Sequence, residues 1–359
     1  MRATLQTIAD ELGVSRSTVS NAYSRPDQLS PELRARIFAA AERLGYSGPN
    51  PTARSLRRGK VDAIGVLLTA NLSMAFTDPY AVAYLRGLAE AAERCETSLL
   101  LVALPKDEAA GLRVVRNAAV DAFCVYCVPH WHGAMDVIRS RGLPVVVGED
   151  PSAVGPVTGY VGINERDAAR QLGQHVADLG HTRVAIIGHW IVDWGSTGPV
   201  LDIGPEQLRY YVTGERVRGY LDALEKAGVP RHQITLINVL DNARGEGAAA
   251  AAYALDRRDR ATAILATSDV LALGVLDALA VRGQRPGRDV SVTGFDDIPE
   301  AAVIGLTTIR QPSVQRGRIA GELLLDPPED PAARRRVLPV SLVVRATTGP
   351  APLQPQEER

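Results

Sequence analysis

Residues 7–20 read TIADELGVSRSTVS, which is the pattern of a helix, a tight turn and a second helix. The apolar residues of the first helix recur at helical spacing: Leu5, Ile8, Ala9 and Leu12. Gly13 ends this helix, because a helix terminus favours a residue that can adopt positive φ. The stretch therefore predicts a small helix-turn-helix unit.

Polar caps set the limits of three short helices. We expect Thr4 to cap the first helix and Ser15 to cap the second, which begins at Arg16. Ser30 and Pro31 open a third helix, with serine as the cap and proline at the first helical position. Three helices on one small core predict a domain over residues 1–46.

The charge of the chain is unevenly distributed. The first sixty residues carry a net charge of +5, whereas the remaining 299 carry −6. A compact basic module is the electrostatic footprint of a DNA-binding domain. On the second helix, Arg16, Ser17 and Asn21 would face outward, with side chains suited to base edges. Phosphate contacts are expected from three hydroxyl residues: Thr4, Thr18 and Ser20. Docking of a protein partner is the alternative for this head.

Residues 47–60 predict a hinge. The prolines and glycine of 48–51 interrupt the third helix, and the segment 52–59 is too short to be a stable helix alone in water. Its basic side chains would be neutralised by phosphates. We expect the hinge to fold on DNA with Leu56 wedged into a minor-groove base step and with Ala53 and Arg57 alongside. An ordinary basic linker is the alternative.

The segment 61–349 alternates short apolar runs with helical stretches. The expected strands are 63–68, 99–103, 122–128, 144–148, 160–163, 183–188, 234–239, 263–267 and 290–293. The clearest helices are 80–94, 165–179, 214–227 and 269–282. Continuous apolar strands between helices predict parallel sheets covered on both faces. Two such units in series predict a two-lobed α/β body.

Six motifs follow one another along the chain: LGY at 44–46, ARSLR at 53–57, LGHTRVA at 179–185, TSDVLALG at 267–274, GFDD at 294–297 and LTTIRQP at 306–312. Their order resembles the lactose-repressor (LacI/GalR) family of bacterial transcription regulators. The resemblance implies a periplasmic-binding-protein-like body in which the chain crosses between the lobes three times. It implies lobe 1 at 61–163 plus 296–325, lobe 2 at 164–295 plus 326–349, and a flexible tail at 350–359.

Ligands of such folds bind at the carboxyl ends of the strands, so we expect an effector between the lobes. The expected contacts are Ser73, Phe76, Asp78, Tyr80, His130 and Glu149 from lobe 1, Trp190, Arg216, Asn242, Ser268 and Asp296 from lobe 2, and Gln311 at a crossover. The resemblance supports Arg216, Ser268 and Asp296 individually. Phe76 and Tyr80 could instead be core residues, and Asp269 could either cap its helix or contact the ligand.

Two features depart from the family. Asn21 replaces the arginine most often found at that position of the recognition helix. The stretch 190–213 is longer than usual and holds two Trp and two Tyr in a chain with 5% aromatic residues. Because long loops are uncommon unless they are functional, we expect this stretch to cover or reshape the cleft.

These observations predict a ligand-responsive repressor that binds a pseudo-palindromic operator as a dimer. The acidic residues Asp78, Glu149, Asp150 and Asp296 favour a neutral, hydroxyl-rich effector, such as a sugar, over a phosphorylated one. The tail at 350–359 contains no leucine heptads, so the tetramer-forming helix of some relatives is not expected.

Other classes of protein find little support. Cys124 and Cys127 lie in an apolar strand and are expected as buried thiols, since residues three apart on a strand face opposite ways. No metal-ligand spacing, nucleophile–base pair or phosphate loop is evident, so no enzyme activity, metal or cofactor is expected. Without a membrane span or signal peptide, we expect a cytoplasmic protein, which opposes a secreted sugar-binding protein. A sugar sensor whose head docks a protein partner is the remaining alternative.

Overall fold

The computed structural model describes residues 3–48, 55, 58–68, 72–105, 107–126, 128, 133–149, 158–192, 196–200, 203, 207–208 and 210–352. The chain divides into two compact units, Met1–Asp62 and Ala63–Arg359. No helix within the described ranges is long and apolar enough to cross a membrane.

Over residues 3–48, the first unit forms the helices α1 (Leu5–Leu12), α2 (Arg16–Ser24) and α3 (Pro31–Arg43) and a short 3-10 turn, η1 (Pro26–Gln28). Side-chain caps begin each α-helix: the Thr7 amide donates to Thr4 Oγ1, the Thr18 amide to Ser15 Oγ and the Leu33 amide to Ser30 Oγ. Gly13 ends α1 with φ of 65°. The core of this unit consists of Leu5, Ile8, Ala9, Val19, Ala22, Ile37, Ala40 and Ala41. The three-helix prediction is confirmed.

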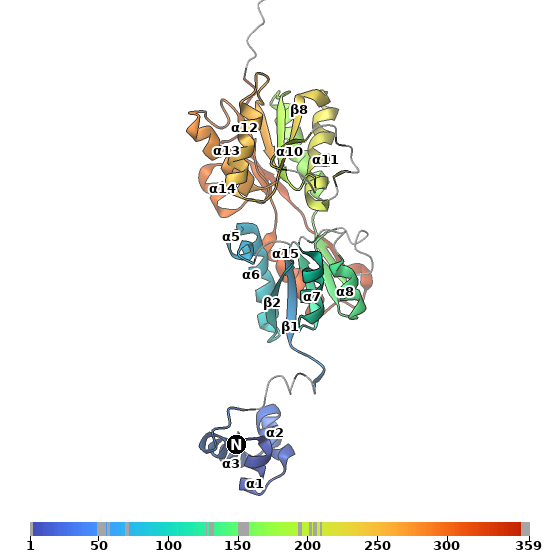
Figure 1. The fold of residues 1–359 in the computed structure, drawn as a ribbon, viewed down its shortest axis with the longest axis vertical. Helices are drawn as coiled ribbons and strands as arrows, with labels where there is room; N and C mark the ends of the chain where they lie inside the picture. The colour runs from blue at the N-terminus through green and yellow to red at the C-terminus, as the bar shows by residue number, and fades with distance from the viewer. Residues whose placement is uncertain are drawn as a thin grey trace, which may run out of the picture. The chain divides into compact units, whose positions relative to one another are not determined.

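Lobe 1 of the second unit is built on a parallel six-stranded sheet in the order β12-β5-β4-β3-β1-β2. Its strands are β1 (Ala63–Leu68), β2 (Ser98–Ala103), β3 (Ala122–Tyr126), β4 (Val145–Val147), β5 (Gly159–Gly162) and β12 (Arg335–Val337). Its helices are α5 (Met74–Thr77), α6 (Pro79–Arg94), α7 (Glu108–Asn117), α8 (Ala134–Ser140) and α15 (Ser313–Leu325). Helices α6 and α15 pack on one face of the sheet, and α7 and α8 pack on the other (Figure 1).

Lobe 2 is built on a five-stranded sheet in the order β10-β9-β6-β8-β7, in which only β7 is antiparallel to its neighbour. Its strands are β6 (Val184–His189), β7 (Gly198–Val200), β8 (Ile234–Val239), β9 (Ala263–Ala266) and β10 (Ser291–Thr293). Helices α10 (Glu165–Asp178) and α11 (Tyr211–Lys226) cover one face. Helices α12 (Arg244–Leu255), α13 (Asp269–Val281) and α14 (Pro299–Ile304) cover the other.

The C-terminal part divides between the lobes differently from the sequence expectation. Ile298, Ala301 and Leu306 are buried with α12 and α13 in the core of lobe 2, although 296–325 is expected in lobe 1. Conversely, β12 pairs in parallel with β5 and extends the sheet of lobe 1, although 326–349 is expected in lobe 2. Strand β11 (Thr308–Arg310), which follows the first of these segments, pairs antiparallel with β13 (Ser341–Val343), which follows β12. Sequence patterns miss β12 because its three residues, two of them arginines, are exposed.

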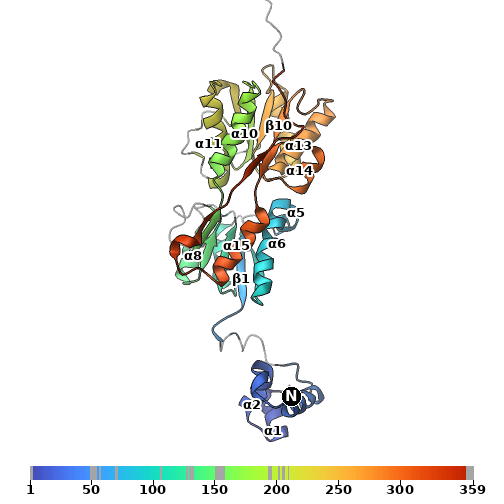
Figure 2. The same ribbon diagram turned by 180° about the vertical axis from the view of Figure 1, so that it is seen from behind.

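Helices α6 and α15 approach each other unusually closely, and Figure 2 shows them side by side. A Cβ on Gly87 of α6 would lie 1.8 Å from the carbonyl oxygen of Val314. A Cβ on Gly317 of α15 would lie 1.9 Å from the carbonyl oxygen of Tyr84. The two backbones therefore touch at a pair of glycines, which no larger residue could replace without separating the helices.

Candidate functional sites

A pocket of about 130 Å³ lies between the lobes, at the carboxyl ends of strands from both sheets. Lobe 1 contributes the ends of β3 and β4 and the beginning of α6, and lobe 2 contributes the ends of β6, β8 and β9. In parallel α/β sheets the strand ends leave the backbone free to diverge, so loops there can present side chains to a ligand. The fold thus produces the cleft that the sequence predicts.

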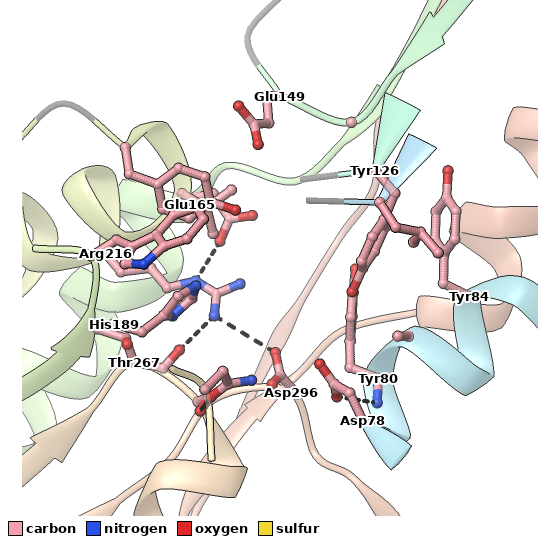
Figure 3. Close-up of a pocket in the computed structure, with 18 of the residues that line it drawn as sticks. Asp78, Tyr80, Tyr84, Tyr126, Glu149, Glu165, His189, Arg216, Thr267 and Asp296 are labelled. Atoms are coloured by element: carbon pink, nitrogen blue, oxygen red, sulfur yellow. Dashed lines mark hydrogen bonds and ion pairs between the residues drawn. The ribbon is translucent and has the colours of Figure 1, made fainter. Parts of the chain in front are cut away.

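Arg216 on α11 occupies the centre of the pocket wall in lobe 2 (Figure 3). Its Nε donates to Glu165 Oε2 at 2.8 Å, and its Nη1 donates to the Thr267 carbonyl oxygen at 2.6 Å. Nη1 also lies 3.7 Å from Asp296 Oδ1, and the guanidinium lies 3.7 Å from the centroid of the Phe295 ring. Burial disfavours the charge, but Glu165 and Asp296 hold the pKa of Arg216 above its ordinary value. The guanidinium is therefore a fixed positive charge.

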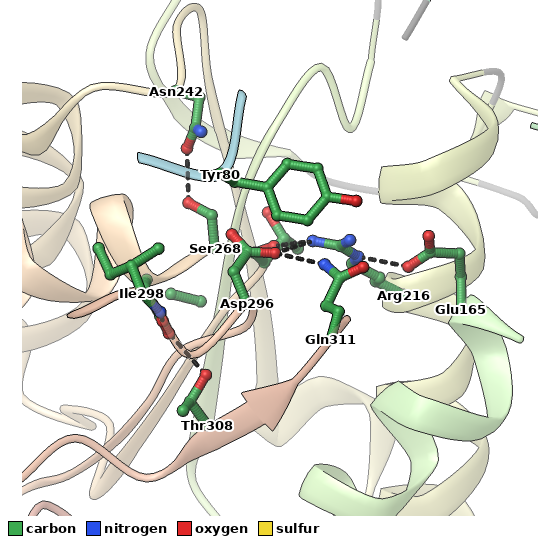
Figure 4. A network of polar contacts seen from close by, with 12 residues as sticks. Tyr80, Glu165, Arg216, Asn242, Ser268, Asp296, Ile298, Thr308 and Gln311 are labelled. Atoms are coloured by element: carbon green, nitrogen blue, oxygen red, sulfur yellow. Dashed lines mark hydrogen bonds and ion pairs between the residues drawn. The ribbon is translucent and has the colours of Figure 1, made fainter. Parts of the chain in front are cut away.

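Asp296 contacts the Gln311 side chain (Figure 4), and Gln311 in turn lies beside Arg316 of lobe 1. Gln311 Nε2 donates to Asp296 Oδ1 at 2.5 Å, and Arg316 Nη1 lies 3.5 Å from Gln311 Oε1. Burial raises the pKa of Asp296 well above its usual range, while Arg216 opposes this increase. Polar contacts thus run from α11 in lobe 2 to α15 in lobe 1.

Asp269 and Ser268 have separate roles at the beginning of α13. The Asp269 carboxylate accepts hydrogen bonds from the Ile298 amide at 2.9 Å and from Thr308 Oγ1 at 2.6 Å. Ser268 is the helix cap, since its Oγ accepts from the Leu271 amide, and Oγ also donates to Asn242 Oδ1. Asp269 therefore stabilises the crossover, whereas Ser268 and Asn242 line the pocket.

Aromatic side chains line the pocket from both lobes. In lobe 1, the rings of Tyr80 and Tyr126 are stacked with centroids 6.1 Å apart. In lobe 2, the Trp190 and Tyr210 rings meet edge to face at 5.4 Å. His189 packs against both lobe 2 rings, and burial lowers its pKa to about 4, so this imidazole is neutral at physiological pH. Such surfaces suit the apolar faces of a sugar ring or another flat ligand.

The stretch 190–213 contributes to this wall. It contains β7, which extends the lobe 2 sheet beside β8, and it brings Trp190, Tyr210 and Val212 to the pocket. The sequence places the next helix at Gly214, whereas α11 begins three residues earlier, at Tyr211. Three described residues of the stretch therefore line the cleft.

The structure places the twelve expected effector contacts in different ways. Eight line the pocket: Asp78, Tyr80, Glu149, Trp190, Arg216, Asn242, Ser268 and Asp296. Ser73 and Phe76 do not, and the Phe76 side chain is 68% exposed. In the short helix α5 it is Ala75 that lines the pocket, so its neighbour points elsewhere. Gln311 lies behind Asp296, and His130 lies outside the described residues.

The pocket residues that are not among the sequence predictions include Tyr126, Glu165, His189 and Arg316. Tyr126 and His189 are the last residues of β3 and β6, and Glu165 is the first residue of α10. The strand ends alone could have identified these three. Arg316 had no such signal, because it reaches the pocket from the first turns of α15 and its neighbours are far away in sequence.

In the first unit, Arg16 and Ser17 at the beginning of α2 are exposed, and Thr18, Ser20 and Asn21 are half-buried. Three hydroxyls also make local hydrogen bonds: Thr4 Oγ1 accepts from the Thr7 amide, and Ser15 Oγ lies 2.6 Å from Ser17 Oγ and 2.8 Å from Thr18 Oγ1. The predicted hinge contacts Ala53, Leu56 and Arg57 lie outside the described residues.

Both units resemble known protein families. Residues 4–50 match the bacterial regulatory proteins, lacI family, and residues 174–348 match the periplasmic binding protein-like domain. An HTH-type transcriptional regulator of Mycolicibacterium smegmatis is 41% identical over 357 residues, which cover 97% of each chain.

Solved structures agree with this likeness. A LacI-family transcriptional regulator from Corynebacterium glutamicum is 34% identical, with a TM-score of 0.73 over 97% of this chain and 99% of that one. The transcriptional regulator CelR in complex with cellobiose is 27% identical, with a TM-score of 0.65 over 96% of this chain and all of that one.

Proposed function

Because this chain belongs to the lacI family of bacterial regulatory proteins, we propose that it is a repressor that binds a pseudo-palindromic operator as a homodimer. A small molecule bound in the pocket controls this binding. The observation that carries the proposal is the pocket itself, which is lined from both lobes by polar and aromatic side chains.

The exposed beginning of α2 supports the DNA-binding part of the proposal. Arg16 and Ser17 are exposed there, and Asn21 lies one turn further along the helix. In a helix-turn-helix protein the second helix enters the major groove and its first residues reach the base edges. Two copies related by twofold symmetry would read two half-sites.

The chemistry of the pocket supports a neutral, hydroxyl-rich effector. Five carboxyl side chains line it, Asp78, Glu149, Glu165, Asp241 and Asp296, against two guanidinium groups, those of Arg216 and Arg316. This balance disfavours phosphate esters, whereas hydroxyl groups can donate to carboxylates and sugar rings can pack on the tyrosines. The likeness to CelR, whose structure contains cellobiose, supports the same ligand class.

A ligand that touches both lobes also provides a means of control. It stabilises whichever angle between the lobes gives it the most contacts and shifts the population toward that angle. The hinge segment follows the head, so a change between the lobes of a dimer alters the spacing of the two hinges. Operator affinity then depends on the effector.

The test is selection of the full-length protein against a random duplex DNA pool at physiological salt, with and without cellobiose. We expect enrichment of a twofold symmetric site. Arg16→Ala should then weaken binding to this site by about 1–3 kcal/mol while changing binding to random duplex less. Arg288→Ala, which removes an exposed arginine of the body, serves as the matched control. Failure to enrich any site in either condition would contradict DNA reading by the head.

A further inference from the structure

Glu149 follows β4 and its carboxyl group lines the pocket from lobe 1. Its side chain is buried, with 7% of the residue exposed. Oε1 is fully buried, and none of the described residues gives it a hydrogen bond. A buried polar oxygen without a hydrogen-bond partner is costly and rare in native proteins, so its position beside a cavity requires an explanation.

The charged groups around Glu149 come from both lobes. Arg316 of α15 acts on it as a positive charge, and Glu165 of α10 as a negative one. Arg316 itself is held in place by the backbone, because its Nη2 donates to the Gly148 carbonyl oxygen at 2.7 Å and its Nε to the Val161 carbonyl oxygen at 3.1 Å. A Cβ at position 148 would lie 2.9 Å from Nη2, so a larger residue there would displace the guanidinium. The Arg316 guanidinium thus donates hydrogen bonds to backbone carbonyl oxygens beside Glu149.

We propose that effector binding in this pocket is coupled to release of a proton from Glu149, whose Oε1 accepts a hydrogen bond from a hydroxyl group of the ligand. This inference rests on the proposed effector role of the pocket. It adds that the ionised carboxylate is the form that binds, and that ligands with a carboxylate at this position are rejected.

The direction of the pH dependence follows from the burial of the group. Burial raises the pKa of Glu149 to about 8, with Glu165 adding to the increase and Arg316 opposing it. The unliganded pocket therefore holds mostly the neutral acid at pH 7. A donor hydroxyl stabilises the carboxylate, which lowers the pKa on binding and releases the proton. Affinity for the ligand consequently increases as the pH is raised through 8.

The size of the effect follows from the fraction of ionised carboxyl. With a pKa of about 8, roughly one molecule in eleven is ionised at pH 7 and roughly ten in eleven at pH 9. The apparent dissociation constant is divided by this fraction when only the ionised form binds. The affinity should therefore increase about tenfold between pH 7 and pH 9.

The experiment is a calorimetric titration of the full-length protein at pH 7 and pH 9. The probes are cellobiose, D-ribose and D-glucose, with D-glucuronate as the charged partner of glucose. Glu149→Gln keeps an acceptor oxygen but cannot ionise, so its affinity should change much less than tenfold. This variant retains Asp78 and Asp296, whose pKa values are also raised by burial. Any pH dependence of its affinity therefore reports the contribution of these two residues. Its melting temperature shows whether it folds.

A tenfold increase for a neutral probe with the wild type, absent in Glu149→Gln, together with rejection of glucuronate, supports the inference. Binding that is equally independent of pH in both proteins overturns it and leaves the proposed function standing. Affinity that decreases with pH also overturns it, because Glu149 would then act as a protonated donor. If no neutral probe binds at either pH, both the sugar-like effector of the proposed function and this inference are rejected.

Discussion

Replacing Arg216 by methionine should strongly destabilise the second unit. The side chain of Arg216 is 8% exposed, and its partners Glu165 and Asp296 are 3% and 7% exposed. Methionine fills much of the same volume but leaves two buried carboxyl groups without their cation. Breaking a buried ion pair by removing one partner costs about 3–5 kcal/mol, so we expect a loss of about 4 kcal/mol in the free energy of unfolding at pH 8.

Urea denaturation followed by tryptophan fluorescence measures this loss. All three tryptophans of the chain, Trp131, Trp190 and Trp194, belong to the second unit, so the signal reports that unit alone. The loss should shrink at pH 5.5, since burial raises the pKa of Asp296 and a proton can then neutralise this carboxyl group in place of the missing guanidinium. As a matched control, Arg86→Met removes a solvent-exposed partner of Glu90 and should change stability by less than about 1 kcal/mol.

A double-mutant cycle with Glu165→Gln tests the reasoning further. Because the two residues are in direct contact at 2.8 Å, the double variant should lose clearly less than the sum of the single losses. A loss below about 1 kcal/mol for Arg216→Met, or strictly additive losses in the cycle, would refute the claim that this cation neutralises the pocket wall.

Three further predictions concern other parts of the chain. Gly87→Ala should lower the free energy of unfolding by about 1–3 kcal/mol, because the new Cβ would lie 1.8 Å from the Val314 carbonyl oxygen. As a control, Gly245→Ala in α12, where nothing lies within 4 Å, should be neutral or slightly stabilising. The melting temperatures of the two variants measure this difference. Burial lowers the pKa of His181 below its ordinary value of 6.5, so the folded state resists protonation of this side chain. The free energy of unfolding should therefore decrease as the pH drops below 6.5. His181→Gln should make the melting temperature depend less on pH. Ser15→Ala removes the acceptor for the Thr18 amide and should destabilise the head by about 1 kcal/mol, seen as faster hydrogen exchange in α2 with no change in the body.

Local chemistry made most of the fold predictable. Ser15 and Gly13 mark helix limits through effects that involve only neighbouring residues, and the structure places α1 and α2 where these residues predict them. The strands of both sheets are equally visible, because a run such as 63–68 is apolar throughout and is buried throughout. The missed strand β12 is short, exposed and paired with a strand more than 150 residues earlier, so nothing in its own composition identifies it.

The pocket was only partly predictable for a related reason. The place of residues at strand ends in the pocket, such as Asn242 and Asp296, can be predicted from topology alone. Arg316 does not, because its guanidinium reaches Gly148 and Tyr80 only after α15 has packed beside α6. Phe76 illustrates the opposite error: an aromatic residue beside Asp78 suggests ligand stacking, but the turn of α5 directs Ala75 to the pocket instead.

The glycine contact between α6 and α15 has a mechanical consequence. Because the backbones of α6 and α15 touch at Gly87 and Gly317, we expect the two helices to move as one rigid body, which carries Asp78 and Tyr80 together with Arg316. Turning of one lobe against the other must then be absorbed in the connecting segments. One of these segments carries Gln311, whose amide holds Asp296 in the pocket wall. The connecting segment and the pocket wall thus share a contact, so a substitution that alters what the pocket recognises should also alter how readily the lobes turn.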